Sequence, residues 1–142
     1  RNELEQGNIE AANEMLGRTF SYDFKVIGGK KLGRKLGSPT MNQNFTDGFV
    51  IPKYGVYISK AFVDGFWHSA VTNIGVCPTF GIDALRSETC ISDFSGNLYG
   101  KHIEVGLIKF LRDEQKFASA EDLGKQMKID IQKSKEYFTA MT

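Results

Sequence analysis

The ten residues from Gly33 to Asn42, Gly-Arg-Lys-Leu-Gly-Ser-Pro-Thr-Met-Asn, combine the residue types of a loop that binds phosphate and metal. Two glycines flank a basic pair and allow a sharp turn or a close approach to a ligand. Thr40 and Asn42 are two residues apart, so their side chains share one face of an extended segment. A hydroxyl and an amide oxygen beside a basic loop are suited to a hard cation and the phosphates that it neutralises. The same residues are also typical of a surface turn that leads into a strand.

Glu88 is the second candidate for chemistry. In a predicted strand, Glu88, Cys90 and Ser92 share one face, and Thr89 and Ile91 share the other. A carboxylate in this position can act as a general base that takes a proton from a hydroxyl. The alternative is an ordinary strand glutamate that faces solvent.

Other reactive side chains give weaker signals. His68 and His102 are the only histidines, and neither has a partner at a metal-ligand spacing, so we expect structural roles for both. Cys77 and Cys90 form no CxxC motif, and Cys77 has no activating neighbour in the sequence. The spacings of a Walker A motif and of the protein-kinase motifs do not occur.

The composition bounds the class of protein. The 142 residues suit one domain, with 41% hydrophobic and 25% charged residues. A net charge of +1 argues against a nucleic-acid binder and a polybasic membrane anchor. No apolar run reaches transmembrane length, and the N-terminus does not resemble a signal peptide. We therefore expect a cytoplasmic protein with reduced thiols and neither a nucleic-acid nor a membrane partner.

Alternating apolar and polar residues predict the strands that must position these groups. Asp64-Gly65, between two apolar runs, is a tight hairpin signal. The expected strands span residues 19–27, 42–45, 54–62, 66–76, 85–94 and 101–111.

Helical patterns stand at the two ends of the chain. Residues 2–16 are predicted to be helical with an interruption at Gly7-Asn8, where Asn8 is placed as an N-cap and Gly17 as a stop. A longer helix is expected over residues 120–138, after Ser119 as cap. Its apolar stripe comprises Leu123, Met127, Ile131 and Phe138. Hairpin signals without strand–helix alternation favour a small antiparallel barrel with this helix outside.

Six motifs follow one another along the chain: Gly33 to Asn42, Tyr54-Gly55-Val56-Tyr57, Asn73-Ile74-Gly75 with Pro78-Thr79-Phe80, Glu88-Thr89, Leu98-Tyr99-Gly100-Lys101, and Phe110 to Glu114 with Lys116-Phe117. In this order they resemble the riboflavin kinase family, and more narrowly the C-terminal kinase module of bacterial bifunctional riboflavin kinase/FAD synthetase. The resemblance covers essentially the whole chain. It implies a mainly β fold: a six-stranded antiparallel Greek-key β-barrel with a long C-terminal helix. Residues 1–17 would be a helical linker from an upstream FMN adenylyltransferase domain, and residues 18–142 the kinase domain.

The resemblance also implies the reaction riboflavin + ATP → FMN + ADP, with Mg²⁺ as the divalent cation. Glu88 would activate the ribityl 5′-hydroxyl, and Thr40 and Asn42 would bind Mg²⁺ and the nucleotide phosphates. Further residues would bind the two substrates. These are Gly29, Gly33 and Arg34 over the ATP phosphates, Tyr99 near the nucleotide, and Arg112 in the loop beside the flavin.

Four residues depart from the family pattern: Phe24, Ser38, Gln43 and Cys90. Because Phe24 and Ser38 border the nucleotide loop, a barrel that binds flavin or FMN with weakened catalysis is the main alternative. An oligonucleotide-binding barrel is a third possibility, which the net charge of +1 disfavours.

Overall fold

The computed structural model describes residues 8–17, 19–27, 40–45, 51–77, 84–92, 98, 100–114 and 119–141. Seven antiparallel strands form one sheet in the order β1-β7-β4-β5-β6-β3-β2. This order places β3 beside β6 after the run β4 to β6, which is a Greek key. The strands are β1 (Phe20–Tyr22), β2 (Val26–Ile27), β3 (Thr40–Asn44), β4 (Gly55–Val63), β5 (Phe66–Cys77), β6 (Ala84–Ile91) and β7 (Glu104–Arg112).

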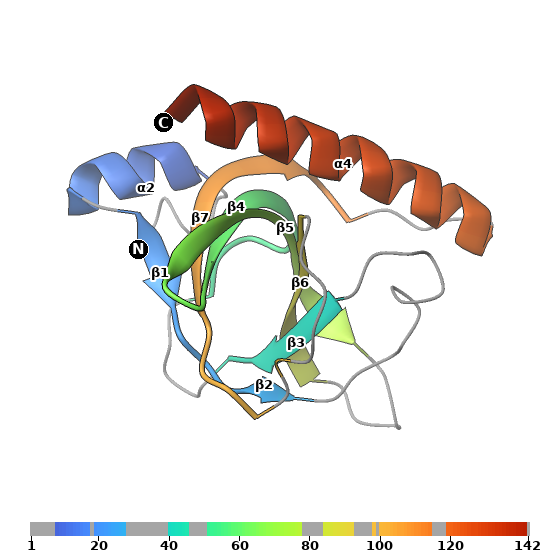
Figure 1. Cartoon of the computed structure of the whole chain (residues 1–142), viewed down its shortest axis with the longest axis horizontal. Helices are drawn as coiled ribbons and strands as arrows, with labels where there is room; N and C mark the ends of the chain where they lie inside the picture. The colour runs from blue at the N-terminus through green and yellow to red at the C-terminus, as the bar shows by residue number, and fades with distance from the viewer. Residues whose placement is uncertain are drawn as a thin grey trace.

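The sheet curls into a barrel because β1 and β2 belong to one continuous segment but lie at opposite ends of the strand order (Figure 1). β1 pairs with β7, and β2 pairs with β3. Gln43, fully buried in β3, reinforces this closure. Its Nε2 donates to the carbonyl oxygens of Phe24 at 2.6 Å and Ile103 at 2.8 Å. Counted as one interrupted strand, β1 and β2 reduce the seven strands to the six that were predicted.

Most strand predictions are confirmed within a few residues. Asp64 and Gly65 form the predicted hairpin turn, with φ values of 51° and 85° that match the type I′ turn. β5 continues unbroken through Gly75. The sequences Thr46-Asp47-Gly48 and Ser95-Gly96-Asn97, which are typical of turns, lie outside the described residues.

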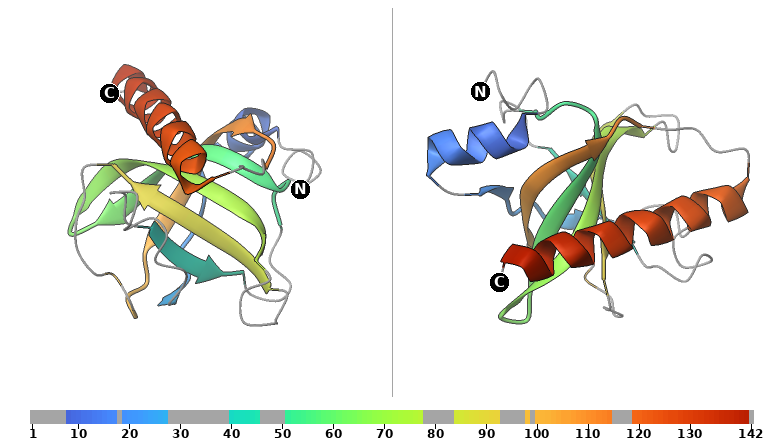
Figure 2. Two further views of the ribbon diagram at one scale, coloured as in Figure 1. Left: turned by 90° about the vertical axis from the view of Figure 1, so that its right-hand side faces the viewer. Right: turned by 90° about the horizontal axis from the view of Figure 1, so that it is seen from above.

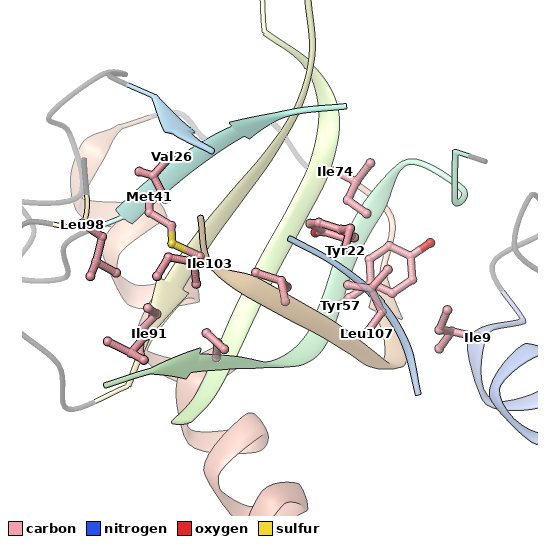
Figure 3. Packing of buried hydrophobic residues seen from close by; sticks show 14 of the residues in the cluster. Ile9, Tyr22, Val26, Met41, Tyr57, Ile74, Ile91, Leu98, Ile103 and Leu107 are labelled. Atoms are coloured by element: carbon pink, nitrogen blue, oxygen red, sulfur yellow. The ribbon is translucent and has the colours of Figure 1, made fainter. Parts of the chain in front are cut away.

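The barrel interior holds a compact apolar cluster (Figure 3). Tyr57 and Leu107 are fully buried there, and Tyr57 contacts the Phe110 ring edge to face at 5.2 Å. Val26, Met41, Leu98 and Ile103 fill the opposite part of the cluster in Figure 3.

Buried hydroxyl groups also line the interior. Thr72 in β5 makes hydrogen bonds to Ser59 at 2.8 Å and to Thr89 at 2.9 Å, so one chain of hydroxyls crosses β4, β5 and β6. Tyr22 and Ser87 form a further hydroxyl pair at 2.5 Å. Burial raises the pKa of Tyr22 above its usual range, so its hydroxyl remains protonated. These bonds fix alternate residues of β6 on the inner face.

Helix α2 (Ile9–Leu16) packs against β1 and β7 (Figure 2). Its Asn13 joins both strands: Nδ2 donates to the Leu107 carbonyl at 2.9 Å, and Oδ1 accepts from the Phe20 amide at 2.6 Å. The helix begins after Asn8 and ends at Gly17 in a left-handed conformation, as predicted, but the Asn8 side chain makes no capping hydrogen bond to the helix. Residues 1–7 lie outside the described part, and the domain boundary at residue 17 stays a prediction.

Helix α4 (Ala120–Met141) covers the outer face of β4 and β5 (Figure 2). The Ser119 hydroxyl accepts a hydrogen bond from the Asp122 amide at 3.1 Å, which confirms the predicted cap. Among the described side chains of the helix, the most buried are polar and do not belong to the predicted apolar stripe. They are Asp130, which is 2% exposed, and Ser134, which is fully buried and donates to the Ala70 carbonyl at 2.6 Å.

Asp130 ties α4 to the end of β7. Its Oδ2 accepts a hydrogen bond from Arg112 Nη2 at 2.8 Å, and its Oδ1 accepts one from Gln126 at 3.0 Å. The Arg112 side chain is 23% exposed, so this ion pair is largely shielded from water. Removing one partner of such a shielded ion pair lowers the free energy of unfolding by more than removing one partner of a surface pair.

We expect Asp130→Asn to lower the free energy of unfolding by about 1.5–3 kcal/mol, because the charge-assisted bond to Arg112 is lost. Glu121→Gln is the matched control on the same helix, since Glu121 forms only an exposed pair with Lys125 at 3.7 Å. Urea unfolding followed by circular dichroism measures both. Equal losses in the two variants would contradict the role given to Asp130.

Gly55 has a φ of 154°, and a Cβ atom there would lie 2.5 Å from the Phe110 ring and 2.8 Å from the Arg112 carbonyl. Gly65 also has a positive φ, but a Cβ atom added to it would have nothing within 4 Å. We therefore expect Gly55→Ala to destabilise the protein by about 1–3 kcal/mol more than Gly65→Ala, owing to overpacking. Thermal unfolding of the two variants compares them, and equal losses would rule out the steric explanation.

Candidate active site

Asn42, Glu88 and Arg112 lie in one row of paired residues that crosses the sheet. In register, Asn42 of β3 opposes Glu88 of β6, and Glu88 opposes Asn73 of β5. Asn73 opposes Val56 of β4, which in turn opposes Arg112 of β7. Directly paired residues of antiparallel strands point to the same face. The row therefore lies on the outer face of the barrel, the face that α4 covers in part.

Glu88 points outward because both of its neighbours in β6 are held inside. Ser87 and Thr89 are fully buried and make hydrogen bonds to Tyr22 and Thr72, respectively. Successive side chains of a strand point to opposite faces, so the residue between them must face outward. The side chain of Glu88 is accordingly exposed.

Asn42 and Glu88 are neighbours across the β3–β6 pair, where opposed Cβ atoms lie about 4.5–5.5 Å apart. Asn42 is only 5% exposed, whereas Glu88 and Asn73 are exposed. The pairing places an amide side chain beside a carboxylate side chain on one face of the sheet. An amide oxygen is a suitable ligand for a hard cation, and the carboxylate is a suitable proton acceptor.

Arg112 shares the row but not the immediate neighbourhood of Glu88. It lies three strand positions away, about 15 Å at the usual strand spacing. Its guanidinium group is bonded to Asp130 of α4. Arg112 therefore joins the helix to the sheet at one end of the row, while Glu88 and Asn42 lie at the other.

The remaining predicted site residues can be placed only in part. Thr40 begins β3 and opposes Cys90, two positions from the Asn42–Glu88 pair, but its side chain is not among the described ones. Four other predicted residues lie outside the described part of the chain: Gly29, Gly33, Arg34 and Tyr99.

Three further polar residues surround Glu88 that the sequence analysis did not single out for the site. Asn73 opposes Glu88, and Arg86 stands two positions earlier on the same face of β6. Glu114, two residues past the end of β7, places its carboxylate over Gly75, in the space that a Cβ atom would otherwise occupy. Burial raises the pKa of Glu114. The alternation of faces along β6 could have placed Arg86 beside Glu88 from the sequence alone. The positions of Asn73 and Glu114 depend on how strands distant in the sequence pair, so the sequence could not show them.

Two of the residues that depart from the family pattern, Phe24 and Gln43, make contacts in the barrel interior. Phe24 stacks on Tyr22 with ring centroids 5.4 Å apart and contacts Phe45 at 5.5 Å. Gln43 makes the closing hydrogen bonds described above. Cys90 is 5% exposed, and Ser38 lies outside the described residues.

Among the described residues, no group of three or more His, Cys, Asp or Glu side chains is arranged to hold a metal ion. A search of the same residues finds no helix with the length and apolar character needed to cross a membrane.

Comparisons with known proteins identify relatives of this chain. Curated relatives described as bifunctional riboflavin kinase/FMN adenylyltransferase include those of Listeria monocytogenes, 37% identical over 99% of this chain, and Escherichia coli, 35% identical over 97%. The chain spans 45% and 44% of these two relatives, less than half of each.

A crystal structure described as a macrolide-efflux protein from Streptococcus pneumoniae superposes with a TM-score of 0.85 at 29% sequence identity. The match covers 94% of this chain and 44% of the other. The family model described as "Flavokinase: Riboflavin kinase" matches residues 16–138, which include every described strand and most of α4. The chain therefore belongs to the riboflavin kinase family.

Proposed function

We propose that this chain transfers the γ-phosphoryl group of ATP to the 5′-hydroxyl of riboflavin, giving FMN and ADP, with Glu88 as the general base. The observation that carries this proposal is the pairing of exposed Glu88 with Asn42 on the outer face of the barrel. This pairing supports a site in which Glu88 accepts a proton and the neighbouring Asn42 binds the cation of the nucleotide.

In the proposed step, Glu88 accepts the proton of the ribityl 5′-hydroxyl while the hydroxyl oxygen bonds to the γ-phosphorus and ADP leaves. Phosphoryl transfer depends mainly on alignment and neutralisation of charge. A rigid strand pair suits alignment, because the backbone of β6 is fixed by interior hydrogen bonds on both sides of Glu88. A positioned base contributes about 10²–10⁴-fold to the rate.

The donor set on β3 fits Mg²⁺, which takes hard oxygen ligands and obtains many of them from substrate phosphates and water. We propose that Asn42, and with it Thr40, hold Mg²⁺–ATP, and that the bound ion neutralises the phosphate oxygens. Gly29, Gly33 and Arg34 are proposed to cover the phosphates, Tyr99 to lie near the nucleotide, and Arg112 to support the loop beside the flavin.

The relatives' names support a wider setting for this reaction. Because each is described as both a kinase and an adenylyltransferase, and this chain aligns with less than half of each, we propose that it acts as the kinase module of a bifunctional FAD synthetase. We place the reaction in the cytoplasm, where ATP is supplied.

Glu88→Gln should lower kcat by about 10²–10⁴-fold, because the amide cannot accept the proton. The Kd for riboflavin, from quenching of flavin fluorescence, should stay nearly constant. Glu14→Gln, an exposed change on α2, is the control. Chromatographic separation of riboflavin and FMN measures turnover. Parent-level turnover in Glu88→Gln would refute the base assignment, and a parent chain that binds riboflavin without forming FMN would favour the weakened-barrel alternative.

Asn42→Ala should raise the Mg²⁺ concentration for half-maximal activity by about 10–100-fold, the effect of losing one strong polar contact. Asn44→Ala is the matched control: Asn44 lies on the same strand and face, two residues further, and is exposed. A magnesium titration at saturating riboflavin compares the variants. Identical titration curves for all three proteins would remove Asn42 from the proposed metal site.

A further inference from the structure

The guanidinium group of Arg86 has buried hydrogen-bond donors that no described residue satisfies. Its Nε and Nη1 atoms are shielded from water, and among the described residues neither has a hydrogen-bond partner. In the part of the chain that the structure describes, no ion pair involves this side chain. Buried donors are nearly always paired, because an unmet hydrogen bond on a charged group is costly. Such a group therefore needs an explanation.

Arg86 lies on the same outer face as the candidate base. It stands two residues before Glu88 in β6, which places the two Cα atoms about 6–7 Å apart. It opposes Asn44 of β3 and Gly75 of β5. Gly75 has no side chain to fill the space beside Arg86, and the Glu114 carboxylate lies over Gly75 in that space.

The order of pairs along β3 and β6 indicates which substrate Arg86 faces. Thr40 opposes Cys90, Asn42 opposes Glu88, and Asn44 opposes Arg86. If Thr40 and Asn42 hold the nucleotide phosphates, the phosphate side of Glu88 is the side towards Cys90. Arg86 then lies on the opposite side, where the rest of the hydroxyl-bearing substrate must extend from its reacting 5′ end.

We propose that Arg86 is a riboflavin-binding residue, whose Nε–H and Nη1–H donate to oxygen acceptors of the substrate beyond its 5′-hydroxyl. The chemistry matches: riboflavin has hydroxyls along the ribityl chain and carbonyl oxygens on its ring, whereas Arg86 has only donors. This inference rests on the proposed function, because it takes Glu88 and Asn42 as the reacting end of the site.

The proposal is tested with two variants of the full chain. Arg86→Met keeps a long side chain without donors, and Arg86→Lys keeps the charge without the planar N–H fork. In Arg86→Met the riboflavin KM, and the riboflavin Kd from fluorescence quenching with Mg²⁺–ADP present, should rise about 10–100-fold. Arg86→Lys should not restore parent values. The ATP KM should change less than about twofold. Lys133→Met, an exposed change on α4, is the charge-removal control.

Unfolding without ligand separates binding from a structural role. Since the buried donors of Arg86 have no partners in the described part of the chain, Arg86→Met should unfold at the same urea concentration as the parent or a higher one. An unaltered riboflavin Kd, a rise confined to the ATP KM, or a lower unfolding midpoint would each overturn the proposal. Its failure is distinguishable from that of the proposed function, because Glu88→Gln would still lower kcat by about 10²–10⁴-fold when only the Arg86 assignment is wrong.

Discussion

The candidate site depends on the register between β3 and β6. A shift of one residue would turn Glu88 into the barrel and bring Ser87 and Thr89 to the surface. That shift is opposed from both faces, because it would bury a carboxylate and break the hydroxyl bonds to Tyr22 and Thr72. The interior polar network thus determines which side chains of β6 face a substrate. Along β6, the residues that pack inside the barrel alternate with the residues that can take part in catalysis on its outer face.

The outer face follows a different organisation on each side of Glu88. On one side, β4, β5 and the end of β7 are covered by α4, which is attached through Asp130 and Ser134 rather than through apolar contacts alone. On the other side, Glu88 of β6 and Asn44 of β3 are exposed, next to the buried side chain of Asn42. The helix therefore leaves the reactive end of the row uncovered while it fixes the strand that ends at Arg112.

The sequence predicted those features of the fold that depend only on residues close to one another in the chain. The hairpin at Asp64-Gly65 follows from two residues that tolerate positive φ, and the helix cap from the Ser119 hydroxyl. The motif order also placed Asn42 and Glu88 in one site; in the structure the two residues are paired in register, and their shared role stays a proposal. The sequence could not show that Arg112 pairs with Asp130, because that contact joins a strand to a helix through the tertiary fold. Neighbours such as Asn73 and Glu114 depend on strand pairing and loop position for the same reason.

Closure of the barrel by the segment that contains β1 and β2 has a consequence for folding. Phe20 pairs with Leu107, so the backbone groups of β1 cannot form their hydrogen bonds to β7 until β7, the last strand of the sheet in the sequence, has been synthesised. β5 can pair with β4, and β6 with β5, as each emerges, but β1 and the second edge of β4 must wait for β7. Contacts so distant in sequence slow folding, and unpaired edges favour association with other chains. The nascent protein therefore carries an open sheet edge until β7 has left the ribosome.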